Sequence, residues 1–231
     1  MLIVIEGLDG AGKSTQVKML KEFILKSGHS LEYLHFPRYE APVYGDLIAS
    51  FLRGDFGDLN QVHPQLVALL YALDRKDAAE EIKRKMESGA VVLLDRYVYS
   101  NIAYQCSKVE DEKKREELRD WILNLEFEFY KIPKPDVNIF LDVPIDFVAQ
   151  RLASSRSEDS GRDYLEGKRD IHEEKISFQE EKISFQEGVR NVYLSECKRD
   201  GSFKRVDCRA ADGKMLSPEE IFERIKAQIT L

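Results

Sequence analysis

Eight residues near the start of the chain have the types and spacing of a phosphate-binding loop. Residues 7–14 read Gly-Leu-Asp-Gly-Ala-Gly-Lys-Ser and match the pattern G-x-x-x-x-G-K-[S/T]. Glycines let backbone N–H groups close around phosphate oxygens, a lysine reaches the terminal phosphates, and a serine hydroxyl suits Mg²⁺. A strand pattern precedes the loop and a helix pattern follows, so an ordinary strand-turn-helix junction is the weaker reading. We predict a nucleoside triphosphate (ATP) site formed by Gly7, Leu8, Asp9, Gly10, Ala11, Gly12, Lys13, Ser14 and Thr15.

A second polar group follows an apolar run. Asp95-Arg96-Tyr97 comes directly after Val91–Leu94, at the carboxyl edge where open α/β sheets bind ligands. An arginine there suits a phosphate and an aspartate suits magnesium or its water ligands, although a surface ion pair closing the strand is the alternative. Because the chain is short and has no guanine-reading N-K-x-D tetrapeptide, these residues favour a small kinase over a GTPase.

The loop 7–14 and the residues Asp95–Tyr97 can form one site only if a sheet brings the ends of their strands together. Short β-rich runs alternate with longer helical patterns, which predicts an α/β fold with a five-stranded parallel sheet flanked by helices. The expected strands are Leu2–Glu6, Leu31–Phe36, Val91–Asp95, Val137–Val143 and Phe203–Val206.

Helical spacing of apolar residues marks the segments between the strands. The stripes include Val17, Leu20, Phe23 and Ile24, and later Ile221, Phe222, Ile225 and Ile229. Gly28 is expected to end the first helix, and Ser217-Pro218-Glu219-Glu220 has the residues that begin a helix. No proline- or serine-rich linker divides residues 1–231, so we predict one domain.

Composition narrows the class of protein. With 33% charged and 43% hydrophobic residues the chain is not disordered, and a net charge of −7 argues against a nucleic-acid-binding surface but allows a basic pocket for a small phosphorylated ligand. Its longest aliphatic run, 90–94, is far short of the ~20 residues of a membrane span. The start of the chain reads as a strand and not as a signal peptide. Three widely spaced cysteines support neither a disulfide framework nor a zinc site, so a cytoplasmic location is expected.

Two segments depart from the alternating pattern. Residues 154–170 are rich in Ser, Arg, Asp, Glu and Gly, which predicts a mobile loop or lid. The heptapeptide Glu-Glu-Lys-Ile-Ser-Phe-Gln then occurs twice, at 173–179 and 180–186. Such a repeat would lengthen a helix while rotating its apolar face by only ~20°. It is read either as a longer helix beside the lid or, preferably, as a tolerated duplication without a function.

The run from Asp95 to Gln105, DRYVYSNIAYQ, resembles the D-R-Y-x-x-S-x-x-A-Y-Q signature of thymidylate kinases. Segments 36–39 (FPRY), 69–75 (LLYALDR) and 141–143 (LDV) agree in order and spacing. The resemblance implies a P-loop NTPase fold, a nucleoside monophosphate kinase domain, Mg²⁺, ATP and dTMP as ligands, and a homodimer formed through helices.

The resemblance also implies roles for residues at the acceptor. Tyr71 should stack on thymine, although a core aromatic is the alternative, and Arg75, one helical turn later, should donate to a base carbonyl. Asn101 would read the base edge, Tyr104 would lie against the sugar, and Asp9 would accept a hydrogen bond from the 3′-hydroxyl. The monophosphate would bind Arg96 with Arg38 and Tyr39; many relatives have F-P-x-R, so which of the latter two reaches phosphate stays open. The matched motifs add Phe36, Ser100 and Gln105 to the expected substrate site.

The source of a catalytic arginine follows from Gly10. Some thymidylate kinases place an arginine at that loop position, and those without it resemble a second type whose arginine comes from the lid. We expect Arg156 to serve, with Arg162 and Arg169 as alternatives. The predicted catalytic residues are Lys13, Asp95, Arg96 and Arg156; the magnesium ligands are Ser14 and Asp95; Arg209 is a weaker candidate for adenine, with a surface loop as its alternative.

Two other functions remain open on the residues alone. A deoxynucleoside kinase would phosphorylate a sugar hydroxyl and need fewer arginines at the acceptor, which Arg38 and Arg96 oppose. A nucleotide-binding regulator without catalysis is opposed by the presence of Lys13, Ser14, Asp95 and Arg96 together.

Overall fold

A computed structural model describes residues 1–57, 61–154 and 174–231. The elements in chain order are β1 (Leu2–Gly7), α1 (Lys13–Lys26), β2 (Leu31–His35), α2 (Tyr44–Leu52), α3 (Pro64–Glu87), β3 (Val91–Asp95), α4 (Val98–Cys106), α5 (Glu112–Leu123), the π-helix η1 (Asn124–Phe129), β4 (Val137–Asp142), α6 (Ile145–Ser154), α7 (Glu174–Arg199), β5 (Phe203–Asp207) and α8 (Pro218–Lys226). The expected lid, after its first residue, and the arginines at 156, 162 and 169 lie outside the described residues.

The five predicted strands form one sheet in the order β2-β3-β1-β4-β5, and every neighbouring pair is parallel. This confirms the α/β prediction, and each predicted strand end lies within one residue of the observed end. In the register, Ile5 pairs with Asp95 and Gly7 with Leu141. The strand ends therefore place Gly7, His35, Asp95, Asp142 and Asp207 along one edge of the sheet.

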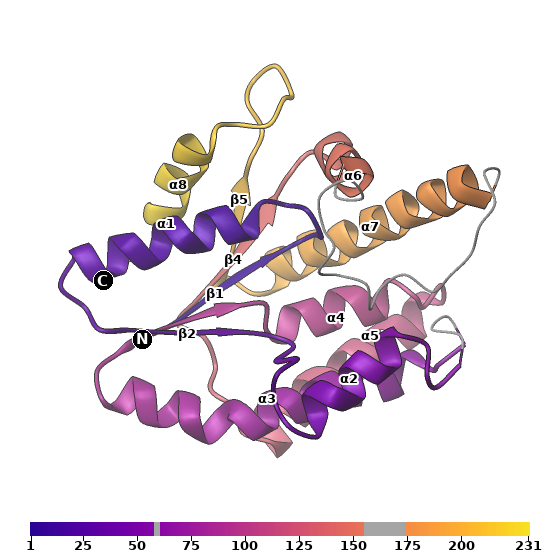
Figure 1. Ribbon diagram of the computed structural model, residues 1–231, viewed down its shortest axis with the longest axis horizontal. Helices are drawn as coiled ribbons and strands as arrows, with labels where there is room; N and C mark the ends of the chain where they lie inside the picture. The colour runs from indigo at the N-terminus through magenta and orange to yellow at the C-terminus, as the bar shows by residue number, and fades with distance from the viewer. Residues whose placement is uncertain (58–60, 155–173) are drawn as a thin grey trace.

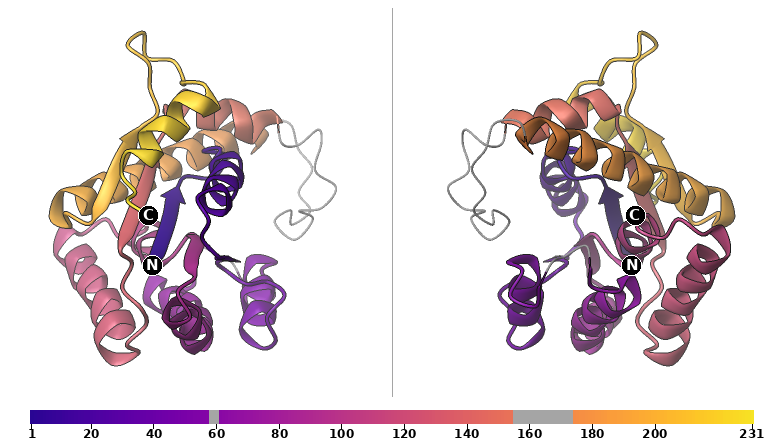
Figure 2. Two further views of the ribbon diagram at one scale, coloured as in Figure 1. Left: turned by 90° about the vertical axis from the view of Figure 1, so that its left-hand side faces the viewer. Right: turned by 90° about the vertical axis from the view of Figure 1, so that its right-hand side faces the viewer.

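Helices cover both faces of the sheet (Figure 1). α1 packs against α8 and the strands β1, β2 and β3 on one face. On the other face α3 contacts β3, α4 contacts β1, and α7 contacts β4 and β5. The side views show the same layers, with α8 beside α1 and the helices α3 and α4 across the sheet (Figure 2). β1, β3 and most of β4 are buried, because helices cover them on both sides.

The helix ends follow from local chemistry. α1 begins after Gly12, whose φ of 77° belongs to the left-handed region that a glycine adopts readily. α8 begins with the predicted cap, where the side chain of Ser217 and that of Glu220 each bond the other residue's backbone N–H. The duplicated heptapeptide from Glu174 onward lies within α7, in agreement with a lengthened helix. None of the helices in the described ranges combines the length and apolar character needed to cross a bilayer.

Candidate active site

The phosphate-binding loop lies between β1 and α1, as predicted. The ammonium of Lys13 donates to the backbone oxygens of Gly7 (3.2 Å) and Leu8 (2.9 Å). Its residue is only 8% exposed, and burial lowers the pKa of Lys13 to about 8. Ser14 and Thr15 are exposed at the first turn of α1, so their hydroxyls can reach a ligand in the loop.

An ion pair connects this loop to the edge of β3. Nη2 of Arg96 lies 2.5 Å from Oδ1 of Asp9, and its guanidinium also lies over the ring of Tyr104. Although burial acts in the opposite direction, Arg96 and Lys13 hold the pKa of Asp9 below its ordinary value. Arg96 has a φ of 67°, an uncommon conformation for a residue with a side chain and one that recurs at functional sites. The pair joins the predicted donor and acceptor residues.

Asp95 carries an acceptor without a partner. Its Oδ1 is buried and has no hydrogen-bond partner among the described residues, whereas Oδ2 lies 3.4 Å from Nδ1 of His35. Burial acts to raise its pKa, but His35 and Lys13 keep the pKa of Asp95 below its ordinary value. An ionised carboxylate with one available oxygen fits a magnesium ion or a water bound to it.

Glu6 was not predicted from the sequence, although it is the one acidic residue that ends the apolar run of β1. Its fully buried carboxylate accepts hydrogen bonds from the backbone N–H groups of Tyr97 (2.9 Å) and Ser100 (3.2 Å). The hydroxyls of Ser100 and Tyr193 also donate to it. Glu6 thereby fixes the first turn of α4 and, with it, the position of Arg96.

Two of the three residues predicted to contact the base, Arg75 and Asn101, bond one buried carboxylate, that of Glu126. Arg75 on α3 donates through Nε (2.5 Å) and Nη2 (2.7 Å) to Glu126 of η1. Asn101 on α4 donates through Nδ2 to the same carboxylate (3.1 Å) and to the backbone oxygen of Ala68 (2.9 Å). Tyr71, one turn before Arg75, is half-buried, and burial raises its pKa to about 12.

Arg38 lies against two aspartates in the middle of α3. Its Nε donates to Asp74 (2.8 Å) and its Nη2 donates to Asp77 (2.6 Å). The guanidinium also lies over the buried ring of Phe36, 5.9 Å from the ring centroid. Phe36 is thus a support beneath Arg38, and Tyr39 follows in the same half-buried segment.

The second copy of the repeated heptapeptide contributes contacts that sequence reasoning missed. Gln186 is buried, and its Nε2 donates to Oδ2 of Asp9 (3.1 Å). Phe185 packs edge-on against Tyr104, with ring centroids 6.0 Å apart. α7 therefore covers the side of the site where the resemblance places the sugar.

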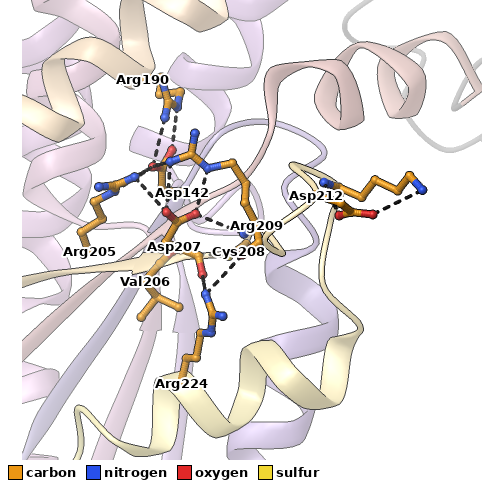
Figure 3. A network of polar contacts seen from close by, with 10 residues as sticks. Asp142, Arg190, Arg205, Val206, Asp207, Cys208, Arg209, Asp212 and Arg224 are labelled. Atoms are coloured by element: carbon orange, nitrogen blue, oxygen red, sulfur yellow. Dashed lines mark hydrogen bonds and ion pairs between the residues drawn. The ribbon is translucent and has the colours of Figure 1, made fainter.

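Two other predicted residues bond groups outside this cluster of contacts. Gln105 is buried and accepts a hydrogen bond from Lys108 (3.1 Å). Arg209 follows β5, two strands from the phosphate-binding loop, and pairs with Asp207 (2.9 Å). Figure 3 shows Arg209 beside Asp142, whose buried carboxylate also accepts from Arg190 and Arg205.

A phosphate-binding loop that faces an arginine across the carboxyl edge of a 2-3-1-4-5 parallel sheet defines a kinase of the P-loop class that acts on small phosphorylated acceptors. The family model for thymidylate kinase matches residues 5–212. With that match, the chain belongs to the thymidylate kinase family, whose members use ATP as the phosphate donor.

Individual relatives agree with the family match. The thymidylate kinase of Mycobacterium tuberculosis strain H37Rv is 39% identical over 163 residues, which cover 70% of this chain and 75% of the relative. The human thymidylate kinase is 33% identical over 152 residues, covering 66% and 65% of the two chains. The solved structure of thymidylate kinase from Candida albicans superposes with a TM-score of 0.66 at 25% identity, covering 98% of this chain and 89% of that one.

Proposed function

We propose that residues 1–231 act as one kinase domain that transfers the γ-phosphoryl group of Mg·ATP directly to dTMP, without a covalent intermediate, giving ADP and dTDP. The observation that carries this proposal is the Arg96–Asp9 pair, because it places an acceptor-side arginine against the donor-side loop. In-line phosphoryl transfer needs positioning and charge neutralisation more than it needs an acid or base.

On the donor side, the loop 7–15 cradles the triphosphate and Lys13 neutralises its terminal oxygens. The carbonyl oxygens of Gly7 and Leu8 accept from two of the three ammonium hydrogens of Lys13, which leaves the third for a phosphate oxygen. Ser14 and Asp95 would hold Mg²⁺, since they offer an exposed hydroxyl and an unpartnered carboxylate oxygen. When bound, the ion neutralises charge between the phosphates.

On the acceptor side, Arg96 binds the monophosphate, with Arg38 or Tyr39 as the second contact. Arg38 would have to share its guanidinium between the phosphate and Asp74, or exchange one for the other. Asp9 accepts from the sugar hydroxyl. Tyr71 stacks on the base, and Arg75 and Asn101 bond its edge; Oδ1 of Asn101, buried and unpartnered among the described residues, is the acceptor for a base N–H.

Assay of ADP release with dTMP, dCMP, dGMP and dAMP as acceptors tests this function. We expect dTMP to have the highest kcat/KM, because cytosine offers the opposite hydrogen-bond pattern to Arg75 and Asn101 and leaves buried groups unpaired. Turnover of thymidine in preference to dTMP would favour the deoxynucleoside kinase alternative, and ATP binding without turnover of any acceptor would favour a regulator.

The remaining expectations are also proposals. A homodimer follows from the family resemblance. A net charge of −7 supports small-molecule ligands over nucleic acid, and the three cysteines, each unpaired, fit a reducing cytoplasm. Arg156 of the lid is proposed as the arginine that neutralises the transferring phosphoryl group.

A further inference from the structure

Glu126 is a buried carboxylate that none of the sequence motifs identified. It lies in η1, the single π-helical segment among the described residues, and its side chain has no exposure to solvent. Three donors converge on it: Nε and Nη2 of Arg75 and Nδ2 of Asn101. Its oxygens therefore bind the two residues that, in the proposed function, read the base.

This contact determines which end of the Asn101 amide faces the ligand. An amide nitrogen has two hydrogens, and here one goes to Glu126 (3.1 Å) and the other to the backbone oxygen of Ala68 (2.9 Å). If the amide were reversed, Oδ1 would face two oxygens that can only accept. Glu126 and Ala68 thus hold Asn101 in one orientation, in which Oδ1 is a buried acceptor without a partner among the described residues.

The same carboxylate directs Arg75. The bidentate contact occupies Nε and one hydrogen of Nη2, and an arginine held in this way has a fixed guanidinium plane. The hydrogens of Nη1 are not used by Glu126 and remain donors. The Glu126 carboxylate consequently fixes the positions of two groups: the Oδ1 acceptor of Asn101 and the Nη1 donors of Arg75.

We propose that Glu126 is a positioning residue that makes the base site select a 4-carbonyl pyrimidine with a protonated N3 over cytosine, by locking the Asn101 amide and the Arg75 guanidinium. This inference rests on the proposed roles of Arg75 and Asn101. Cytosine presents an acceptor at N3 and a donor at its amino group, so it could bind only if the Asn101 amide reversed and the Arg75 donor turned away from the amino group. The reversal is opposed by Glu126, both of whose oxygens already accept from Arg75, and by the backbone oxygen of Ala68, which can only accept.

The test compares kcat/KM for dTMP and for dCMP, at saturating ATP, in the wild type, Glu126→Gln and Glu126→Asp. The glutamine amide can donate to a reversed Asn101, which leaves only the backbone oxygen of Ala68 opposed to the reversal, so we expect the dTMP-to-dCMP ratio to fall at least ~10-fold. Aspartate keeps the charge beside Arg75 but is one methylene shorter and cannot hold both partners, so a smaller fall in the ratio is expected. A ratio is independent of the fraction of folded enzyme.

Glu128→Gln is the matched control. Glu128 lies in the same π-helical segment, but its side chain is 68% exposed and pairs with Lys134, so the ratio and the KM for ATP should not change. If the wild type prefers dTMP and both Glu126 variants keep its ratio, with equal losses for the two acceptors, Glu126 is only structural and the proposal fails. Should Glu126→Gln not fold, the Glu126→Asp ratio decides alone. A wild type without preference for dTMP would instead contradict the proposed function.

Discussion

The Lys13 side chain can be charged or neutral at pH values close to neutrality, because its pKa is lowered to about 8. Burial lowers its pKa to about 8 in the protein without a nucleotide, and the carbonyl oxygens of Gly7 and Leu8 accept its hydrogens. A triphosphate would bring negative charge to the ammonium and raise its pKa again. Binding above pH 8 must therefore take up a proton.

We expect the affinity for ATP to be constant near pH 7 and to fall as the pH rises through about 8. The reason is that Lys13 is charged below this pH and neutral above it, so each further pH unit costs up to ~10-fold in the dissociation constant. Calorimetric titration between pH 7 and 9.5, in two buffers of different ionisation enthalpy, measures both the affinity and the proton uptake. Lys13→Arg is the control, since its guanidinium keeps its charge; an equally flat profile in the wild type would contradict the prediction.

At the residue scale, sequence analysis found the groups that would meet ligand but missed the groups that hold them. Lys13, Asp95, Arg96 and Arg75 stand in recognisable patterns because phosphate and base chemistry restricts their types. Glu126 stands in an unremarkable Leu-Glu-Phe-Glu-Phe run. It meets Arg75, 51 positions away, only through the packing of α3 against η1, so its position in the sequence gave no signal.

The bounds of a strand were predictable from the sequence where helices cover both faces of the sheet. Val91–Asp95 is a continuous apolar run with polar residues at its end, and β3 has the predicted bounds because helices cover both faces. The π-helical turn at 124–129 was not predictable, since it depends on how α5 continues into the segment below α3 rather than on a local pattern.

Helix α8 offers a test of a local signal. Ser217→Ala should lower the free energy of unfolding by about 1 kcal/mol, because the Ser217 hydroxyl no longer accepts from the backbone N–H of Glu220 or donates to the Glu220 carboxylate. The loss should reach the site only weakly, since α8 packs on α1 toward its C-terminal half, where Phe222 lies edge-on against Phe23. Urea unfolding measures it. Glu219→Gln changes a residue of the same first turn that is not part of the capping box, so it should lower the free energy of unfolding by only a few tenths of a kcal/mol. If the two variants lost equal free energy of unfolding, the capping box would have no special role.

The lid arginine is a prediction about an element outside the described residues. Gly10 leaves Lys13 as the sole cation of the loop 7–14, and an arginine supplied by a closing segment can be worth ~10³ or more in rate. We expect Arg156→Ala to lower kcat far more than it raises the KM for dTMP, as an interaction made mainly in the transition state requires. Steady-state kinetics of Arg156→Ala, Arg162→Ala and Arg169→Ala compare the candidates. Wild-type kcat in all three would exclude a lid arginine.

At the scale of the whole molecule, the sheet edge explains why distant segments form one site. Parallel strands end at the same edge, so residues after β1 and β3 meet although they are 87 positions apart, as Asp9 and Arg96 do. Sequence alternation was enough to predict this edge. It did not predict that α7 returns over it to place Gln186 on Asp9, because a helical pattern does not state which neighbour a helix covers.

Exposed apolar side chains point to where a second copy of the chain would dock. Large hydrophobic residues are exposed just before α2, on α2, on the loop that follows it and at the start of α3: Val43, Leu47, Phe56 and Leu66. α2 and α3 pack against each other, so these residues belong to one helical layer on the outside of the molecule (Figure 1). Burying exposed apolar surface of this kind in an interface favours the association of two chains.

We therefore expect sedimentation to give about twice the chain mass of 26.7 kDa, and the double substitution Leu47→Glu with Leu66→Glu to shift the protein toward monomer, because it would bury four carboxylates in a two-fold interface. Phe129→Glu is the control: Phe129 is 75% exposed but lies in η1, outside α2 and α3, and its substitution should leave the mass unchanged. If the double variant stays dimeric while Phe129→Glu dissociates, the interface lies on the η1 side. The α2 layer would then be free in the dimer, and its apolar residues would need another explanation.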